Sequence, residues 1–174
     1  MRLVLLLFAF AAALLASTPR TLRVDYFHTG SATQEVFSLD RVVREPLPWP
    51  GPRDRGIDDT NLGKYAFEVA EAATGRLLYS RGFCSIYGEW ETTDEAKALT
   101  RTFSESLRFP EPGGPVKVTL KKRDAANAFK PIWTFTLDPS DPALDRALPP
   151  SAGALIPLQR SGEPPEKVDL LILG

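Results

Sequence analysis

Short stretches of alternating hydrophobic and polar residues recur along most of the chain. The clearest runs from Val116 to Lys121, where Val, Val and Leu alternate with Lys, Thr and Lys. A two-residue period is typical of a β-strand with one face in a core and the other in water. The same pattern predicts further strands near residues 22–28, 35–45, 65–69, 103–109 and 129–137.

The densest hydrophobic stretch is Arg76–Trp90, RLLYSRGFCSIYGEW. Alternation on either side of a glycine predicts strand, bend and strand, so we expect this segment to form the middle of the core. Gly82 and Gly88 interrupt the run. A glycine inside a strand pattern usually marks a bulge or the close approach of another backbone.

The segment TTDEA that follows predicts one short helix near residues 93–99. Thr92 is the expected N-cap, with Glu95 reaching back from the third position. No βαβ alternation and no repeat occurs in the chain. The predicted fold is therefore all-β, a β-sandwich of about seven to eight short antiparallel strands.

The strand pattern occupies residues 21–137, and different patterns flank it. Residues 1–17 hold one basic residue, an apolar run and small residues, the layout of a signal peptide. An uncleaved anchor is the alternative, although the apolar run is shorter than the about 20 residues that span a bilayer. Residues 138–167 contain DPSDP, LPP and EPP and predict a Pro-rich linker.

The chain's last residues, 168–174 (VDLLILG), are apolar again. An apolar strand at this place would leave an unpaired edge, so we interpret it as the start of a missing catalytic domain. Together with the signal peptide, this layout predicts a secreted or periplasmic protein with no membrane span after signal cleavage.

Charge and cysteine content exclude several classes of protein. The chain has 21 Lys and Arg against 22 Asp and Glu, so it offers no long-range field that would hold nucleic acid. No phosphate-binding glycine loop of the Walker or dinucleotide type occurs. Cys84 is the only cysteine, which excludes an internal disulfide, and we expect it to be a small core residue.

His28 is the only histidine, so any Ser-His-Asp or Cys-His arrangement would have to include it. Its neighbours form no nucleophile motif, and no H-E-x-x-H occurs. We therefore expect His28 to be a structural residue at the end of a strand, with its hydrogen bonds satisfied.

Two acidic segments could carry chemistry. The four acidic residues between Glu89 and Glu95 are dense enough to supply a carboxylate pair for glycoside hydrolysis. A solvated cluster in the first turn of a helix is the favoured interpretation, because the helix dipole stabilises acids there. The segment Asp58–Asn61 offers oxygen ligands for calcium without EF-hand spacing, and side-chain bonding within a turn explains it more simply.

Three aromatic residues are candidates for an interaction surface: Trp49, Tyr87 and Trp90. Core packing is the default for rings at strand spacing, and exposure on a binding face is the alternative. Trp49 lies in PLPWPGPRDRG, residues 46–56, which we expect to be an extended surface loop because its prolines suit no regular element.

Six blocks of the chain between about Thr21 and Leu137 carry a resemblance: TLRVDYFHTG, EVFSLDRVVREPLPWPG, IDDTNLGKYAFEV, ATGRLLYSRGFCSIYGEWETTDEA, RTFSESLRFPEP and VTLKKRD. Together, and in this order, they resemble the N-terminal domain of the secreted IgA-peptidase-type zinc metallopeptidases (peptidase family M-64). The terminal VDLLILG also resembles the segment that opens the catalytic domain of that family.

The resemblance implies an all-β, non-catalytic accessory domain that packs on, or presents substrate to, a following zinc peptidase domain. No catalytic residue of the family can be assigned to any position of this chain, and zinc is expected only in the missing domain. The expected partners are that peptidase domain and a protein or glycan substrate. The alternatives are a stand-alone secreted module that binds glycan or protein, and a small hydrolase using Glu89 or Glu91.

Overall fold

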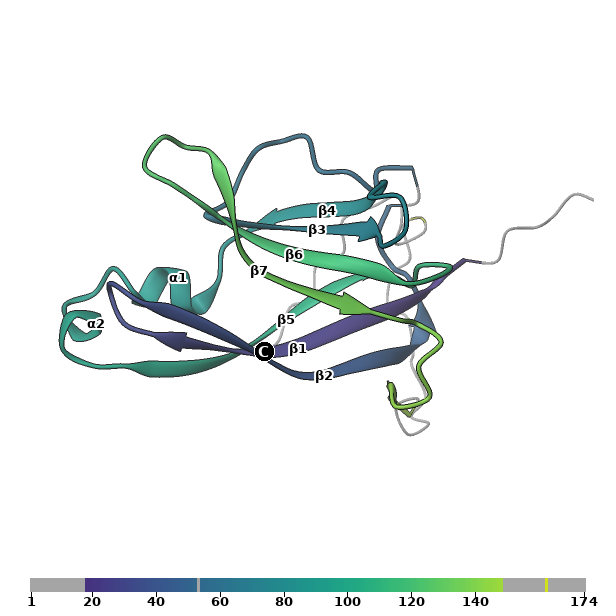
Figure 1. The fold of residues 1–174 in the computed structure, drawn as a ribbon, viewed down its shortest axis with the longest axis horizontal. Coiled ribbons are helices and arrows are strands. Elements are labelled where there is room, and N and C mark those ends of the chain that lie inside the picture. The colour runs from purple at the N-terminus through teal and green to yellow at the C-terminus, as the bar shows by residue number, and fades with distance from the viewer. Residues whose placement is uncertain (1–17, 53, 149–161, 163–174) are drawn as a thin grey trace, which may run out of the picture.

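The computed structural model describes residues 18–52, 54–148 and 162. These residues form two four-stranded sheets that pack face to face, with two short helices at one end (Figure 1). The predicted all-β sandwich is confirmed.

The first sheet has the strand order β5-β1-β2-β8. Its members are β1 (Arg20–Gly30), β2 (Glu35–Pro48), β5 (Arg101–Pro110) and β8 (Asp145–Arg146). β1 pairs antiparallel with both β2 and β5, whereas β8 lies parallel to β2. The parallel pair departs from the purely antiparallel arrangement that the sequence predicted.

The second sheet has the order β4-β3-β6-β7 and is antiparallel throughout. Its strands are β3 (Tyr65–Glu71), β4 (Leu77–Phe83), β6 (Val116–Arg123) and β7 (Phe129–Leu137). The predicted alternation at 116–121 holds, because Val116, Val118 and Leu120 are buried while Lys117 is exposed.

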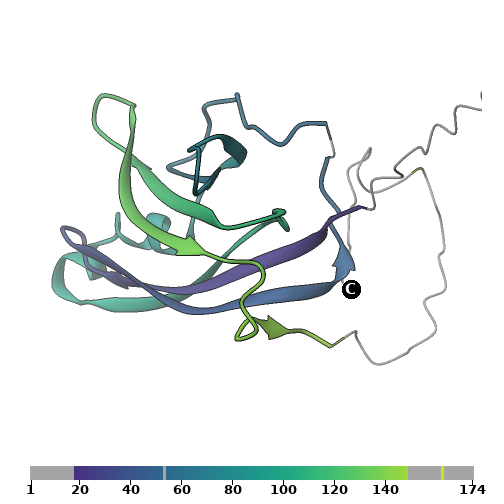
Figure 2. The ribbon, with the colours of Figure 1, turned by 45° about the vertical axis from the view of Figure 1, so that its right-hand side comes forward.

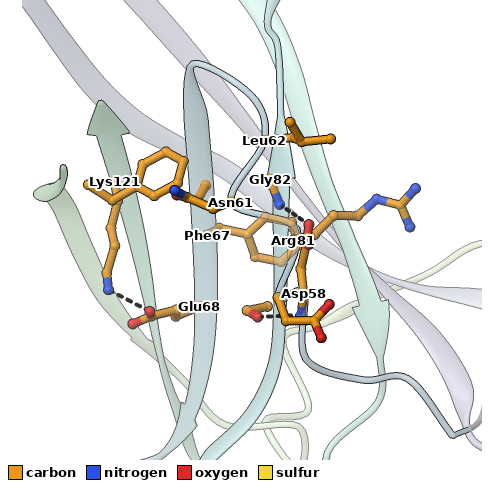
Figure 3. A pocket seen from close by; sticks show the side chains of 12 residues that line it. Asp58, Asn61, Leu62, Phe67, Glu68, Arg81, Gly82 and Lys121 are labelled. Carbon is orange, nitrogen blue, oxygen red and sulfur yellow. Dashed lines mark hydrogen bonds and ion pairs between the residues drawn. The ribbon is translucent and has the colours of Figure 1, made fainter. Parts of the chain in front are cut away.

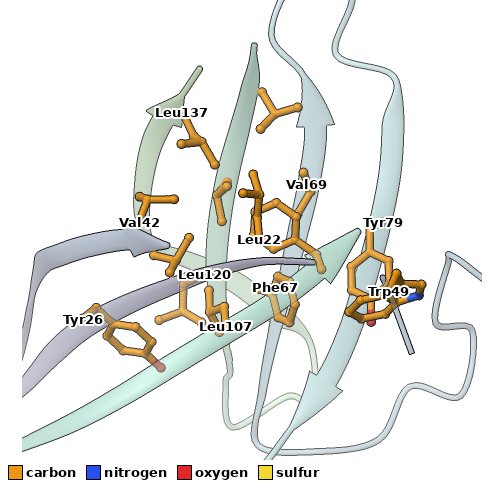
Figure 4. Packing of buried hydrophobic residues seen from close by; sticks show 14 residues of the cluster. Leu22, Tyr26, Val42, Trp49, Phe67, Val69, Tyr79, Leu107, Leu120 and Leu137 are labelled. Atoms are coloured by element: carbon orange, nitrogen blue, oxygen red, sulfur yellow. The ribbon is translucent and has the colours of Figure 1, made fainter. Parts of the chain in front are cut away.

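The core lies between the central strands of the two sheets (Figure 4). Leu22 and Val24 of β1 belong to the same buried cluster as Val118 and Leu120 of β6, and all four are at most 1% exposed. Each such side chain stabilises the fold by roughly 1.5–3 kcal/mol when fully buried. The buried core side chains come mainly from β1, β3, β5 and β6.

The prediction that Arg76–Trp90 forms the middle of the core is wrong. Its first half is β4, an edge strand, and its second half is the helix α1 (Ile86–Trp90). The side chain of Ser85 caps this helix by accepting a hydrogen bond from the Gly88 amide. This cap favours a helix over a strand from Ile86 onward. Gly88 lets the helix pack close to Tyr65, because a Cβ added at Gly88 would lie 2.7 Å from Tyr65 Cε2.

The predicted helix near residues 93–99 exists as α2 (Asp94–Ala98). Its N-cap is Thr93, whose side chain accepts from the Ala96 amide, and not Thr92 as expected. Thr92 instead donates its hydroxyl to the Glu89 carbonyl at the end of α1. The two helices follow each other so closely that the first threonine closes one helix and the second begins the next.

The segment expected to begin a linker stays on the first sheet for several residues. The Arg44 guanidinium donates to the Pro139 carbonyl at 2.7 Å, Leu144 packs against the core, and β8 follows beside β2 (Figure 2). Regular sandwich contacts therefore extend past Leu137. The expected signal peptide at 1–17, most of the linker and the apolar segment 168–174 lie outside the described residues.

Candidate functional site

Charged side chains meet between the two sheets at the end where α1 lies. His28 is at the centre and only 1% exposed. Its Nδ1 lies 3.1 Å from Glu105 Oε2, and its Nε2 lies 3.0 Å from Glu35 Oε2. The Tyr26 hydroxyl donates to the same Glu105 oxygen at 2.9 Å, and the Tyr65 hydroxyl donates to Glu35 at 3.2 Å.

Two lysines extend this arrangement. Lys122 Nζ lies 2.9 Å from Glu35 Oε1 and 2.9 Å from Glu91 Oε2. Lys64 also pairs with Glu91 and donates to the Gly88 carbonyl at 2.8 Å. We define the charged cluster as His28, Glu35, Lys64, Glu91, Glu105 and Lys122.

The pairing favours the charged form of most members of the cluster. Burial alone would lower the pKa of His28, but its hydrogen bonds to Glu105 and Glu35 outweigh burial and raise that pKa above its ordinary value. Burial likewise opposes ionisation of Glu35 and Glu105, yet the bonds from His28 and its neighbours bring both carboxyl pKa values below normal. With His28 protonated, the cluster balances three positive against three negative charges.

Tyr87 of α1 covers the cluster. Its ring stacks on His28 with centroids 3.7 Å apart, and its backbone amide donates to Glu105 at 3.2 Å. Its hydroxyl faces the carbonyls of Ser31 and Gln34 at 2.7 and 2.9 Å. Burial raises the pKa of this hydroxyl to about 12. Tyr87 therefore fixes α1 to the turn between β1 and β2.

The chemistry of the cluster is limited by access. A histidine between two carboxylates can hold and move a proton, which is the arrangement that acid–base catalysts use. None of the four principal cavities in the described part of the chain is lined by His28, Glu35 or Glu105. His28 is thus buried and hydrogen-bonded at both ring nitrogens, as the sequence predicted, and the cluster joins α1 to both sheets.

The three predicted interaction residues occupy different environments. Trp49 is 7% exposed and packs edge-on against Tyr79, with centroids 5.6 Å apart. Tyr87 is buried in the charged cluster. Trp90 is half-buried against Phe103, and its indole N–H donates to Glu95 at 2.7 Å. The structure brings Tyr87 and Trp90 together, with centroids 5.7 Å apart, and leaves Trp49 among other residues.

The acidic segment after α1 divides between two environments. Glu95 pairs with Arg101 at the surface, as expected of a solvated cluster. Glu91 contradicts that expectation, because its side chain is only 11% exposed and pairs with Lys64 and Lys122. Cys84 is exposed in the segment between β4 and α1, so the prediction that it is a small core residue is wrong.

The segment Asp58–Asn61 forms the side-chain turn that the sequence predicted. Asp58 Oδ1 accepts from the amide and the hydroxyl of Thr60 at 2.9 and 2.6 Å. Its Oδ2 accepts from the Gly82 amide on β4 at 2.8 Å, beside a shallow cavity of about 250 Å³ (Figure 3). The acid is therefore used to hold the loop against the edge of the second sheet.

Sequence reasoning missed four members of the charged cluster: Glu35, Glu105, Lys64 and Lys122. A signal for two of them was present in the strand period. Glu105 lies on the same face of β5 as Leu107 and Phe109, which are buried. Lys122 likewise lies on the same face of β6 as the buried Leu120. A charged residue at an inward position needs a partner of opposite charge, so the pattern itself indicated buried ion pairs.

The described residues contain no group of three or more His, Cys, Asp or Glu side chains arranged to hold a metal ion. Among the same residues, no helix is both long and apolar enough to cross a membrane.

Comparison with known proteins supplies the family. A search of curated proteins found no match. A family model described as Peptidase M64 N-terminus matches residues 15–134, which contain β1 to β6 and most of β7. Since this match covers more than half of the 174 residues and contains the charged cluster, the chain belongs to the Peptidase M64 N-terminus family.

Proposed function

We propose that this chain is a non-catalytic accessory domain of a secreted, IgA-peptidase-like zinc metallopeptidase, and that it packs on, or presents substrate to, the following peptidase domain. The family match supports the parentage. The observation that supports the non-catalytic part of the proposal is the pairing of His28 with Glu35 and Glu105 in the interior. Histidine and glutamate are the residue types of an acid–base site, yet here they pair with one another in the interior and connect β1 to β2 and β5.

The proposed site of action is outside the cytoplasm. Residues 1–17 have the layout of a signal peptide, which supports export of the chain. The proposed partners are the peptidase domain and a protein or glycan substrate of that domain.

A test for activity uses the purified chain alone. We expect no hydrolysis of casein or of a fluorogenic peptide with or without added zinc, and no zinc retained at one ion per chain after dialysis. Turnover that depends on zinc would contradict the proposal.

A second test measures the accessory role directly. We expect deletion of this domain from a full-length M64 peptidase to raise KM for a protein substrate, or to lower the melting temperature of the peptidase domain. An unfused domain added back should restore the lost property in part. If deletion leaves KM, kcat and melting temperature unchanged, the accessory role is contradicted.

A further inference from the structure

The two sheets have four edge strands, and three of them carry features that hinder the addition of another strand. β4 is covered by residues 56–62, because its Ser80 amide donates to the Gly56 carbonyl at 2.9 Å. β7 contains Pro131, which has no amide to donate, and its register with β6 is interrupted there. β8 is only two residues long.

β5 has none of these features. Its ten residues pair with β1 in an unbroken register from Arg101 to Pro110, with proline only at its last position. Within the described ranges, no backbone hydrogen bond joins β5 to any segment other than β1. One edge of β5 therefore has backbone donors and acceptors without a partner among the residues that the structure describes, and such an edge is a template for a further strand.

A groove runs beside this edge, between β5 and β4. It has a volume of about 400 Å³, and Ser106, Leu107 and Arg108 of β5 form one wall. The opposite wall is formed by Tyr79 and Phe83 of β4 together with Trp49. Strand addition combines such a backbone edge with a pocket for alternate side chains.

The charged side chains that line this groove are both arginines. Arg81 and Arg108 both line it, and no Asp or Glu is among the described residues of its lining. Arg108 forms an ion pair with Glu45 on the outer face of the sheet, whereas Arg81 is exposed on β4, near Asp58. An acidic side chain on a bound segment would meet a complementary charge here.

We propose that β5 binds an extended polypeptide segment by strand addition, with an apolar side chain in the groove and an acidic residue beside Arg81 and Arg108. This inference rests on the proposed function, because a strand added to β5 is how the accessory domain would hold a substrate polypeptide. The occupant is a peptide, since glycans offer no ladder of amide donors.

The test uses the chain itself and a synthetic heptapeptide, TEVLVET, whose central leucine and two glutamates share one face when extended. Amide NMR spectra recorded during titration should show shifts in residues 104–108 and in the Trp49 indole N–H. No shift at these positions by about 5 mM peptide, an affinity too weak for a specific site, would overturn the proposal.

Two backbone-methylated versions of the peptide test the mode of binding. Methylation on one set of alternate amides removes the donors that face β5, and methylation on the other set removes donors that face solvent. Strand addition requires that one version bind at least about tenfold more weakly while the other binds like the parent peptide. Equal loss in both versions, or in neither, would contradict strand addition.

The charge is tested with Arg81→Glu and with the matched control Lys117→Glu, which reverses an exposed charge on the same sheet away from the groove. Arg81→Glu should weaken TEVLVET at least about tenfold and Lys117→Glu less than about twofold. A preference of Arg81→Glu for the peptide TKVLVKT would strengthen the assignment. Equal effects of the two variants would overturn it.

A second copy of this chain is the competing occupant. Self-pairing through β5 would give a dimer in which the second copy occupies that edge, so TEVLVET could not bind there. Sedimentation with and without TEVLVET therefore distinguishes the two occupants. Such a dimer, with no peptide binding, would overturn the inference. The measurement needs no peptidase domain, so failure of peptide binding here is distinct from failure of the accessory role, which is tested by domain deletion.

Discussion

The ring of Tyr87 stacks on the imidazole of His28, with centroids 3.7 Å apart and planes inclined by 23°. These residues come from α1 and β1 and are distant in the sequence. An imidazolium held by Glu35 and Glu105 at its two nitrogens presents its face to the aromatic ring. The buried imidazolium therefore contacts both α1 and neighbouring strands of the first sheet, and these contacts hold the helix against the sheet.

Replacing His28 by Gln should destabilise the chain by about 3–5 kcal/mol, because removal of one partner leaves buried carboxylates uncompensated. The free energy of unfolding is measured with urea at neutral pH. Lys97→Gln is the matched control, since Lys97 forms an exposed ion pair with Asp94, and it should change stability by less than about 0.5 kcal/mol. A loss below about 1 kcal/mol for His28→Gln would show that the cluster is not a source of stability.

The charged cluster also predicts how stability varies with pH. The pKa of His28 is raised above 6.5, so its contribution is complete below pH 6.5 and is lost as pH rises through the folded-state pKa. The pKa values of Glu35 and Glu105 are lowered below 4.5, so their contributions are complete above pH 4.5 and are lost as pH falls through the folded-state values. Unfolding free energy should therefore be highest between pH 4.5 and 6.5.

His28→Gln separates the two limbs of this profile. The variant lacks the imidazole, so the decline in stability above pH 6.5 should flatten relative to the parent chain. Urea unfolding measured at intervals of half a pH unit gives both profiles. Parallel alkaline limbs in the two proteins would mean that His28 does not titrate in this way.

Local sequence pattern carried most of the information on the strands. Leu22, Val24 and Tyr26 alternate with polar or exposed residues because β1 has one face on the core, and a period of two is visible without any knowledge of partners. Apolar alternation alone did not separate a strand from α1, because five residues are too few to show a helical period.

The charged cluster was harder to predict because its contacts are not local. Glu35 and Lys122 are 87 positions apart, and His28 and Glu105 are 77 apart. Their parity indicated that some charged residues point inward, but strand order decides which of them meet. Pairing β1 between β2 and β5 places Glu35 and Glu105 on either side of His28, and that order is a property of the whole sandwich.

Gly82→Ala should destabilise the chain by about 1–3 kcal/mol, because overpacking forces neighbouring backbone to move. An added Cβ would lie 2.1 Å from the Leu62 carbonyl oxygen, so residues 56–62 must shift away from β4. Gly113→Ala is the control, as nothing lies within 4 Å of its added Cβ. Urea unfolding of the two variants checks the difference, and equal stabilities would contradict the close approach that the structure shows.

Asp58→Ala should weaken the same contact by a different route. The substitution removes the acceptor for the Gly82 amide and both bonds to Thr60, and loss of hydrogen bonds to a charged group costs about 1–3 kcal/mol. The neighbouring Asp59→Ala provides the control, because the Asp59 side chain is 85% exposed and its pair with Arg55 spans 4.0 Å. Hydrogen exchange of the Gly82 amide should accelerate in Asp58→Ala and stay unchanged in Asp59→Ala. If Asp58→Ala leaves that amide protected, the β4 edge is closed by the loop backbone and not by the carboxylate.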